Sequence, residues 1–213
     1  MQTSQILLDE LMCVLWIITY TLCFISTIKY QYLALSPITQ LMIAPFEFAV
    51  LCSFISKGSF RFDYVSIAYL YWTVIEIALY VLVVKYAFHN NRKKTIIYFS
   101  AMAVMTVLMF YLVAVKNYMF FFSYFNTFIG ELFWCYYILK KDYPTKPLNL
   151  AAFIAKFVGD AISIPVYLHT GNLVSSIICV LLPILDFSFI YIYFVRSRKS
   201  RRTEKKTYKY DIV

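Results

Sequence analysis

The chain has 213 residues, of which 62% are hydrophobic and only 15% are charged, with a formal net charge of +9. A soluble domain carries about 25% charged residues, so this composition excludes an ordinary soluble domain and favours a membrane protein. The five Cys show no CxxC spacing, and P-loop, GxGxxG and HExxH patterns are absent. We therefore expect no metal and no cofactor.

Seven apolar segments follow one another along the chain, each long enough to cross a hydrocarbon core of about 30 Å with roughly 20 residues. The first has no basic residues before it and no A-x-A-like site after it, so we expect a retained span and not a cleaved signal. Short polar stretches, including residues 90–94 and 169–172, separate the segments. The predicted helices cover residues 11–28, 37–56, 65–87, 95–115, 118–139, 149–168 and 173–195. The expected fold is an all-α, polytopic membrane protein, a bundle of seven transmembrane helices over residues 1–195.

Basic residues are distributed unevenly between the two ends of these predicted spans. With the N-terminus outside, 15 of the 20 Lys and Arg residues fall in cytoplasmic segments and three fall on the opposite side. Such a bias predicts an N-out, C-in orientation. Eight of the 15 lie in residues 196–213, which we expect to form a flexible cytoplasmic tail. The lipid bilayer accounts for this basic charge, and no nucleic-acid partner is needed.

Five acidic residues lie inside the apolar segments. Each costs about 2.5–3.5 kcal/mol near a bilayer centre, so such residues usually face a bundle interior or a wet cavity. In two spans a proline precedes the acid and can bend the helix, which makes these two acids the strongest candidates for function. The five are Glu47, Glu76, Glu131, Asp160 and Asp186, and the two that follow prolines are Glu47 and Asp186.

The sequence suggests different surroundings for the other acids. Lys156 and Asp160 are four residues apart, so they can form an ion pair along one helix face. We expect Glu131 either to snorkel toward the cytoplasmic end or to pair with a lysine of an inner loop. Asp186 has no basic residue within a helical turn, so it needs a partner from another span or must carry a proton.

Aromatic residues make up 20% of the chain, and several lie within the spans near the acids. Trp72 precedes Glu76 by one helical turn, and Tyr69 lies close to the same face. Aromatic faces stabilise cations within about 6 Å. Acids that create a cation and rings that hold it suit cationic cyclisation, but aromatic walls equally suit a transporter for a planar ring.

The order of these features resembles the integral-membrane terpene cyclases of fungal meroterpenoid and indole-diterpene pathways, which are small seven-span proteins. Trp16-Ile-Ile-Thr-Tyr20 is similar to the Trp-x-x-x-Tyr pattern of that family. Phe46-Glu47-Phe48 is similar to its Trp-Glu-Phe-like motif, with Phe46 in the place of Trp, and Ile43 stands where an Asn is expected one turn earlier. Trp72 with Glu76, and Leu185-Asp186-Phe187, match the acid motifs of two later spans.

This resemblance implies metal-independent terpenoid biosynthesis of the isomerase or lyase type. A carboxylic acid would protonate an epoxide or alkene of a lipophilic, prenylated substrate, and the carbocation would close rings in an aromatic-lined cavity. Glu47 and Asp186 match the catalytic acids, with Glu76 as a helper. The substrate-binding residues would be Trp16, Tyr20, Tyr69, Trp72, Glu131, Trp134 and Asp160.

Two alternatives remain at this stage. The segment 159–171 resembles the corresponding part of the seven-span nicotinamide riboside uptake family, although paired Trp motifs are not evident. In that case the acids and aromatics would bind a nucleoside-like molecule for transport. The other alternative is a non-enzymatic membrane scaffold. Protein partners are not predicted by any feature of the sequence.

Overall fold

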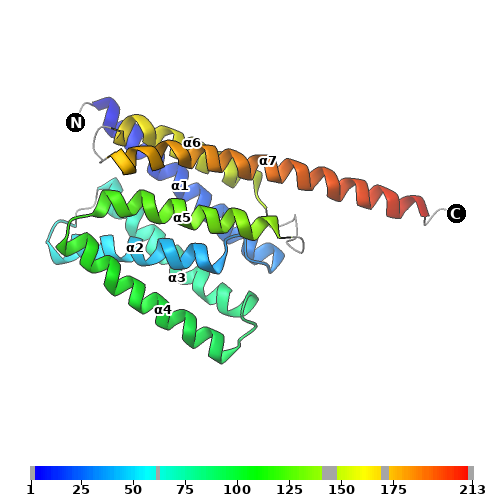
Figure 1. Ribbon diagram of the computed structural model, residues 1–213, viewed down its shortest axis with the longest axis horizontal. Helices are drawn as coiled ribbons and strands as arrows, with labels where there is room; N and C mark the ends of the chain where they lie inside the picture. The colour runs from blue at the N-terminus through cyan, green and yellow to red at the C-terminus, as the bar shows by residue number, and fades with distance from the viewer. Residues whose placement is uncertain (1–2, 61–62, 141–147, 169–172, 211–213) are drawn as a thin grey trace.

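The computed structural model describes the whole chain except residues 1–2, 61–62, 141–147, 169–172 and 211–213. The described residues form seven α-helices and no strand, which confirms the predicted all-α class (Figure 1). The predicted turn at 169–172 and much of the predicted loop after residue 140 lie outside the described residues. The helices are α1 Thr3–Tyr30, α2 Pro37–Ser56, α3 Tyr64–Tyr86, α4 Arg92–Phe110, α5 Met119–Leu139, α6 Leu150–Tyr167 and α7 Leu173–Tyr210.

Polar residues in the predicted separators start the helices. Ser36, Asp63, Asn91 and Asn149 each occupy the N-cap position and accept a hydrogen bond from a backbone N–H of the first turn. Such caps satisfy N–H groups that have no partner within the helix. The helix boundaries therefore follow from local sequence chemistry.

The junction between α4 and α5 is short. A five-residue π-helical segment, η1 (Tyr111–Val115), ends α4, and only three residues separate it from α5. Asn117 within this junction has a positive φ of 59°, a conformation that Asn adopts more readily than most residues. This backbone reversal allows two helices to be connected by three residues.

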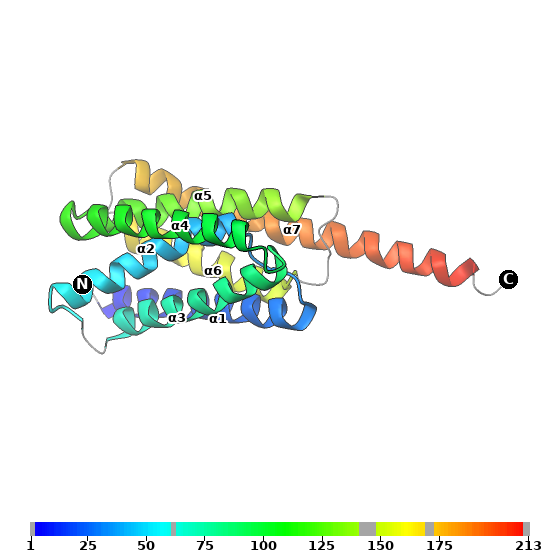
Figure 2. The same ribbon diagram turned by 90° about the horizontal axis from the view of Figure 1, so that it is seen from below.

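α7 is longer than the predicted span. It continues past Val195 to Tyr210 and extends beyond the other helices (Figures 1 and 2). No Gly or Pro follows Pro183, and the terminal segment is rich in Lys, Arg and Glu, which are good helix formers. Where the sequence suggested a flexible tail, the chain leaves the bundle as a continuous helix.

Six of the helices form a closed ring, because each packs against two neighbours in the order α1, α6, α7, α5, α2, α3 and back to α1. α4 lies outside this ring and packs mainly against α2. Figures 1 and 2 show the helices lying side by side along a common direction, with successive helices running opposite ways. The ring therefore has an interior to which six helices can contribute side chains.

The distribution of polarity is the reverse of that in a soluble bundle. Val104 and Val107 on α4 are 67% and 71% exposed, whereas Glu131 and Asp186 are completely buried. Five helices (α1, α2, α3, α4 with η1, and α7) are long and apolar enough to cross a membrane. α5 and α6 are not among these five, and they carry three of the buried charged residues, Glu131, Lys156 and Asp160.

Candidate functional site

Every helix of the ring contributes a polar or aromatic side chain to the interior. All five acids singled out from the sequence are buried there, each with 5% exposure or less. They divide into two groups. Glu47 on α2 and Glu76 on α3 lie on one side of the ring, and Glu131, Asp160 and Asp186 lie together on the other.

Glu47 of the first group borders a cavity, here called the central cavity, with a volume of about 50 Å³. Its walls combine aromatic rings with one carboxyl group and one amine. Four of the predicted substrate-binding residues, Trp16, Tyr20, Tyr69 and Trp72, line it together with Glu47. The full lining is Trp16, Thr19, Tyr20, Ile43, Phe46, Glu47, Tyr69, Trp72, Ser123, Thr127 and Lys156.

The aromatic walls of this cavity pack against one another. The ring centroids of Trp16 and Trp72 are 5.7 Å apart, and those of Tyr69 and Trp72 are 5.1 Å apart with the planes nearly perpendicular. Edge-to-face contacts of this kind fix the rings in defined orientations. The cavity thus has π-faces from Trp16 of α1 and from Tyr69 and Trp72 of α3, two helices that are distant in the sequence.

Glu47 is the acid of the central cavity. The Tyr20 hydroxyl donates a hydrogen bond to Glu47 Oε1 at 3.1 Å, while Oε2 is buried and has no hydrogen-bond partner among the described residues. A buried carboxylate without a compensating charge is expensive in an apolar environment, and a protonated carboxyl avoids this penalty. One oxygen is therefore oriented by Tyr20, and the hydrogen-bonding capacity of the other is unused within the described residues.

Glu76 lies one turn beyond Trp72 and is 2% exposed. Its Oε2 also has no hydrogen-bond partner among the described residues. Glu76 borders two spaces other than the central cavity. One is an apolar groove between α3 and α4 that also contacts Thr73, Tyr80 and Met102.

The other space, the cluster-side cavity, links the two groups of acids. It touches Glu76 and Glu131, and it shares four lining residues with the central cavity: Thr19, Tyr20, Ile43 and Lys156. Its remaining lining residues are Cys23, Leu35, Thr39 and Trp134.

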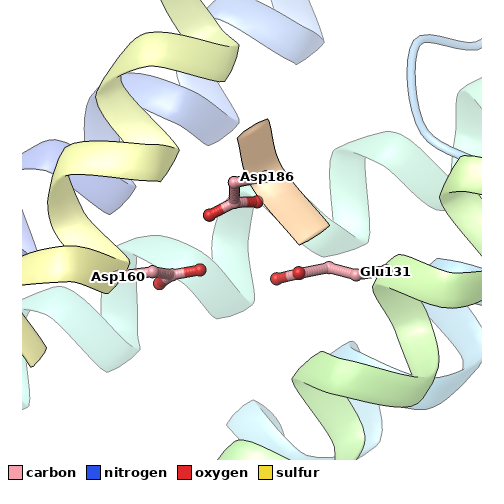
Figure 3. Close-up of side chains that lie close together, drawn as sticks. All are labelled: Glu131, Asp160 and Asp186. Atoms are coloured by element: carbon pink, nitrogen blue, oxygen red, sulfur yellow. The ribbon is translucent and has the colours of Figure 1, made fainter. Parts of the chain in front are cut away.

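The second group of acids surrounds one lysine and is called here the Lys156 cluster: Glu131 of α5, Lys156 and Asp160 of α6, and Asp186 of α7. Lys156 Nζ lies 2.6 Å from Asp160 Oδ2 and 3.2 Å from Asp186 Oδ1, and it also forms an ion pair with Glu131 Oε1. The three carboxyl groups point toward one another in Figure 3, which does not draw the lysine. A single ammonium group therefore serves three carboxyl groups from three helices.

The cluster confirms some expectations and corrects another. The predicted ion pair between Lys156 and Asp160 is present, and Asp186 obtains its partner from another helix as required. The expectation that Glu131 would snorkel or pair with a loop lysine is wrong. Glu131 is 0% exposed and pairs with Lys156 inside the bundle, because the packing of α5 against α7 and of α7 against α6 brings it to the ring interior.

The Lys156 cluster contacts the central cavity through two side chains. Lys156 itself lines that cavity, and the Trp16 indole N–H donates a 2.8 Å hydrogen bond to Asp160 Oδ1. Asp160 thus acts on the cavity by holding Trp16, and Asp186 is not among the residues that line the central cavity. Oxygens of the three carboxyl groups lie within 4.8 Å of one another, a spacing that could hold a metal ion, but Lys156 Nζ already contacts all three.

Trp134 has a different environment from the other predicted aromatic residues. Its indole N–H donates a 2.7 Å hydrogen bond to the carbonyl oxygen of Ala34, and its ring packs against Phe153 and Phe189. It forms part of the wall of the cluster-side cavity but does not reach the central cavity. We interpret Trp134 as a packing residue that supports the site.

Sequence reasoning missed two features. Lys156 was recognised only as the partner of Asp160, and its contacts with Glu131 and Asp186 depend on tertiary packing. Gln40 was not selected, although it is completely buried and neither amide atom has a hydrogen-bond partner among the described residues. A glutamine within an apolar span was the available signal.

No protein-family model, curated protein or solved structure matches this chain.

Proposed function

We propose that the chain is a seven-span integral membrane protein with its N-terminus outside and its C-terminus in the cytoplasm. The C-terminal ends of α1, α3 and α5 and the extended part of α7 lie at one end of the bundle (Figure 1). That end contains Lys29, Lys85, Arg92 and Lys140 near the helix termini, as well as the basic segment of α7. The positive-inside rule assigns this end to the cytoplasm.

We further propose that this membrane protein is a metal-independent terpene cyclase that acts on a lipophilic, prenylated substrate. The carboxyl group of Glu47 would give its proton to an epoxide oxygen, and the C–O bond would break to leave a carbocation. Double bonds of the prenyl chain would then attack the cation in turn. Loss of a proton from the last cation would give the cyclised product.

The observation that carries this proposal is the position of Glu47 in an aromatic cavity. Tyr20 donates a hydrogen bond to one of its oxygens, and the other has no hydrogen-bond partner in the part of the chain that the structure describes. Rings of Trp16, Tyr69 and Trp72 form the surrounding wall. A carboxylic acid kept neutral in an apolar site can donate a proton. The π-faces would stabilise the developing cation by up to about 2 kcal/mol or more each when it is desolvated.

We place the entry of such a substrate at the outer surface. The groove between α3 and α4 is apolar, opens on the side of the bundle that faces lipid in our proposal, and reaches Glu76. An adjoining apolar groove continues along α2 and α4 and shares Phe48 and Thr106 with it. A prenyl chain dissolved in the bilayer could reach the interior without passing through water.

The test is incubation of membranes containing the protein with a panel of epoxidised prenyl compounds. We expect a cyclised product from the wild type and a loss of at least about 100-fold for Glu47→Gln, the lower range for a general acid. Glu10→Gln is the matched control, because Glu10 is on α1 and does not line the central cavity. No cyclised product from the wild type, or undiminished product from Glu47→Gln, would contradict the proposal.

Transport of a small molecule is the second candidate, and it is favoured by a series of adjoining cavities. A third cavity, reaching Asp9 and Met12 of α1, shares Trp16, Tyr69 and Trp72 with the central cavity. Together with the cluster-side cavity it extends the space along the bundle axis. Saturable uptake of a labelled nucleoside into vesicles, without any cyclised product, would support transport over cyclisation.

A further inference from the structure

The charge of the Lys156 cluster is not balanced. Three carboxylates and one ammonium sum to a net charge of −2, and all four side chains are buried, with Lys156 at 8% exposure and the three acids at 0%. Isolated buried charges cost so much that the groups change their protonation state instead. Two bound protons would make the cluster neutral.

The geometry favours protons over a metal ion as the neutralising species. Lys156 Nζ contacts all three carboxyl groups and so occupies the position that a coordinated cation would need. At the same time Glu131 Oε2 and Asp186 Oδ2 are buried and have no hydrogen-bond partner among the described residues. Each of these oxygens can carry a proton, and carboxyl groups this close titrate as one unit.

Two cavities with shared lining residues adjoin both the cluster and Glu47. Lys156 lines both the cluster-side cavity and the central cavity, and Glu131 lines the former. Tyr20 lines both cavities as well, and its hydroxyl is bonded to Glu47 Oε1. Within the described residues, the other titratable groups lining these two cavities are Tyr69 of the central cavity and Cys23 and Glu76 of the cluster-side cavity.

We propose that the Lys156 cluster is a proton-exchange site that holds two protons and exchanges one of them with Glu47 through the Tyr20 hydroxyl. This proposal deepens the proposed function and rests on it for the role in turnover. Glu47 loses a proton to the substrate, and the last carbocation gives a proton to Glu131, the cluster member that lines the adjoining cluster-side cavity. The cluster then returns a proton to Glu47. The protons balance over the cycle, and no external acid or base is consumed.

The proton content can be measured without any substrate, by infrared absorption of the carboxylic C=O group in the full-length protein in lipid nanodiscs at neutral pH. We expect this absorption to persist when Glu47→Gln and Glu76→Gln are combined. It should then decrease further when Glu131→Gln or Asp186→Asn is added. Absence of the absorption in the Glu47→Gln, Glu76→Gln variant would show that the cluster is fully ionised and would overturn the proposal.

If a cluster variant does not fold, the protonation of the cluster can be tested on the wild type by isotope labelling. Glu131 can hold only one of the two protons, so at least one must lie on Asp160 or Asp186. Incorporation of aspartate labelled with ¹³C at its carboxyl carbon should therefore shift part of the carboxylic absorption. An unshifted spectrum would contradict the assignment of two protons to the cluster.

The exchange step is tested by the rate at which the carboxylic band assigned to Glu47 shifts after transfer to D₂O. We expect Tyr20→Phe to slow this rate by about 100-fold, the lower range for a positioned proton donor. Tyr69→Phe is the matched control, because Tyr69 lines the central cavity but not the cluster-side cavity. Equal rates in Tyr20→Phe and the wild type would overturn the path, whether or not the protein cyclises prenyl substrates.

Discussion

Buried acids on the two sides of the ring interior have opposite electrostatic surroundings. In the Lys156 cluster, three carboxyl groups share one ammonium group that contacts each of them. Glu47 and Glu76 have no ion-pair partner among the described residues, and one oxygen of each has no hydrogen bond. Acidic residues that are equally buried therefore contact an ammonium group in the Lys156 cluster but have no such partner at Glu47 and Glu76, within the described residues.

This difference indicates a structural role for the Lys156 cluster and a chemical role for Glu47. Ion pairs in a low-dielectric interior are held tightly, so the cluster joins α5, α6 and α7 and fixes Trp16 through Asp160. An isolated carboxyl group has no such structural task. Glu47 faces the central cavity, and Tyr20 is its one hydrogen-bond partner among the residues that the structure describes, so its carboxyl group can react with a bound molecule.

Removal of the shared cation should give the largest effect on stability. Lys156→Met leaves three buried carboxyl groups without their ammonium, so we expect a loss of about 3–5 kcal/mol in the free energy of unfolding. The loss should shrink as the pH falls, because an additional proton can then neutralise the cluster. Denaturant unfolding in micelles measures it, with Lys85→Met, at an exposed position on α3, as the control. Equal losses for the two variants would show that the cluster does not depend on Lys156.

In the proposed membrane protein the outer face of α4 contacts lipid, and a charge on that face tests this. Val107 is 71% exposed on a helix that carries no charged residue between Lys94 and its end. Val107→Lys should cost about 2.5–3.5 kcal/mol on insertion scales and reduce the amount of folded protein in membranes. Val107→Leu should leave that amount unchanged. A well-tolerated lysine would mean that this face of α4 contacts water.

Gly159 leaves room for Trp16, whose indole N–H is hydrogen-bonded to Asp160 and so links the central cavity to the Lys156 cluster. A Cβ added at Gly159 would lie 2.9 Å from both Cδ1 and Nε1 of Trp16, whereas at Gly130 it would lie 3.1 Å from the flexible end of Ile43. We expect Gly159→Ala to cost about 1–3 kcal/mol, as overpacking usually does. It should also change the tryptophan fluorescence, because the indole must move from Asp160. Gly130→Ala is the matched control and should cost less; the reverse order would show that Trp16 is not tightly held.

The positions of the helices could be predicted from the sequence because they depend on local features. Apolar runs of the required length alternate with polar residues such as Asp63 and Asn91, which cap the next helix. The exceptions are the ends of the chain, where α1 starts earlier and α7 continues further than predicted. In these segments, charged residues reduce the hydropathy without breaking the helix.

The grouping of the acids could not be predicted, because it depends on which helices pack together. Lys156 and Asp160 are neighbours on one helix, so their ion pair was visible in the sequence. Glu131 and Asp186 are 25 and 30 positions from Lys156, and only the packing of α5, α6 and α7 brings them to it. Tyr20 and Glu47 were each predicted as site residues, but the hydrogen bond between them was not predicted, because it joins two different helices.

The smallest expected effect on stability belongs to the isolated acid. Glu47→Gln replaces one uncharged group by another of the same shape if Glu47 is protonated, and the amide oxygen can still accept the Tyr20 hydrogen bond. We therefore expect a change of about 1 kcal/mol or less in the free energy of unfolding, measured as for Lys156→Met. A loss as large as that of Lys156→Met would mean that Glu47 is ionised and paired. Glu47 would then not differ from the acids of the Lys156 cluster. A small loss, together with loss of cyclised product, would assign Glu47 to chemistry and not to folding.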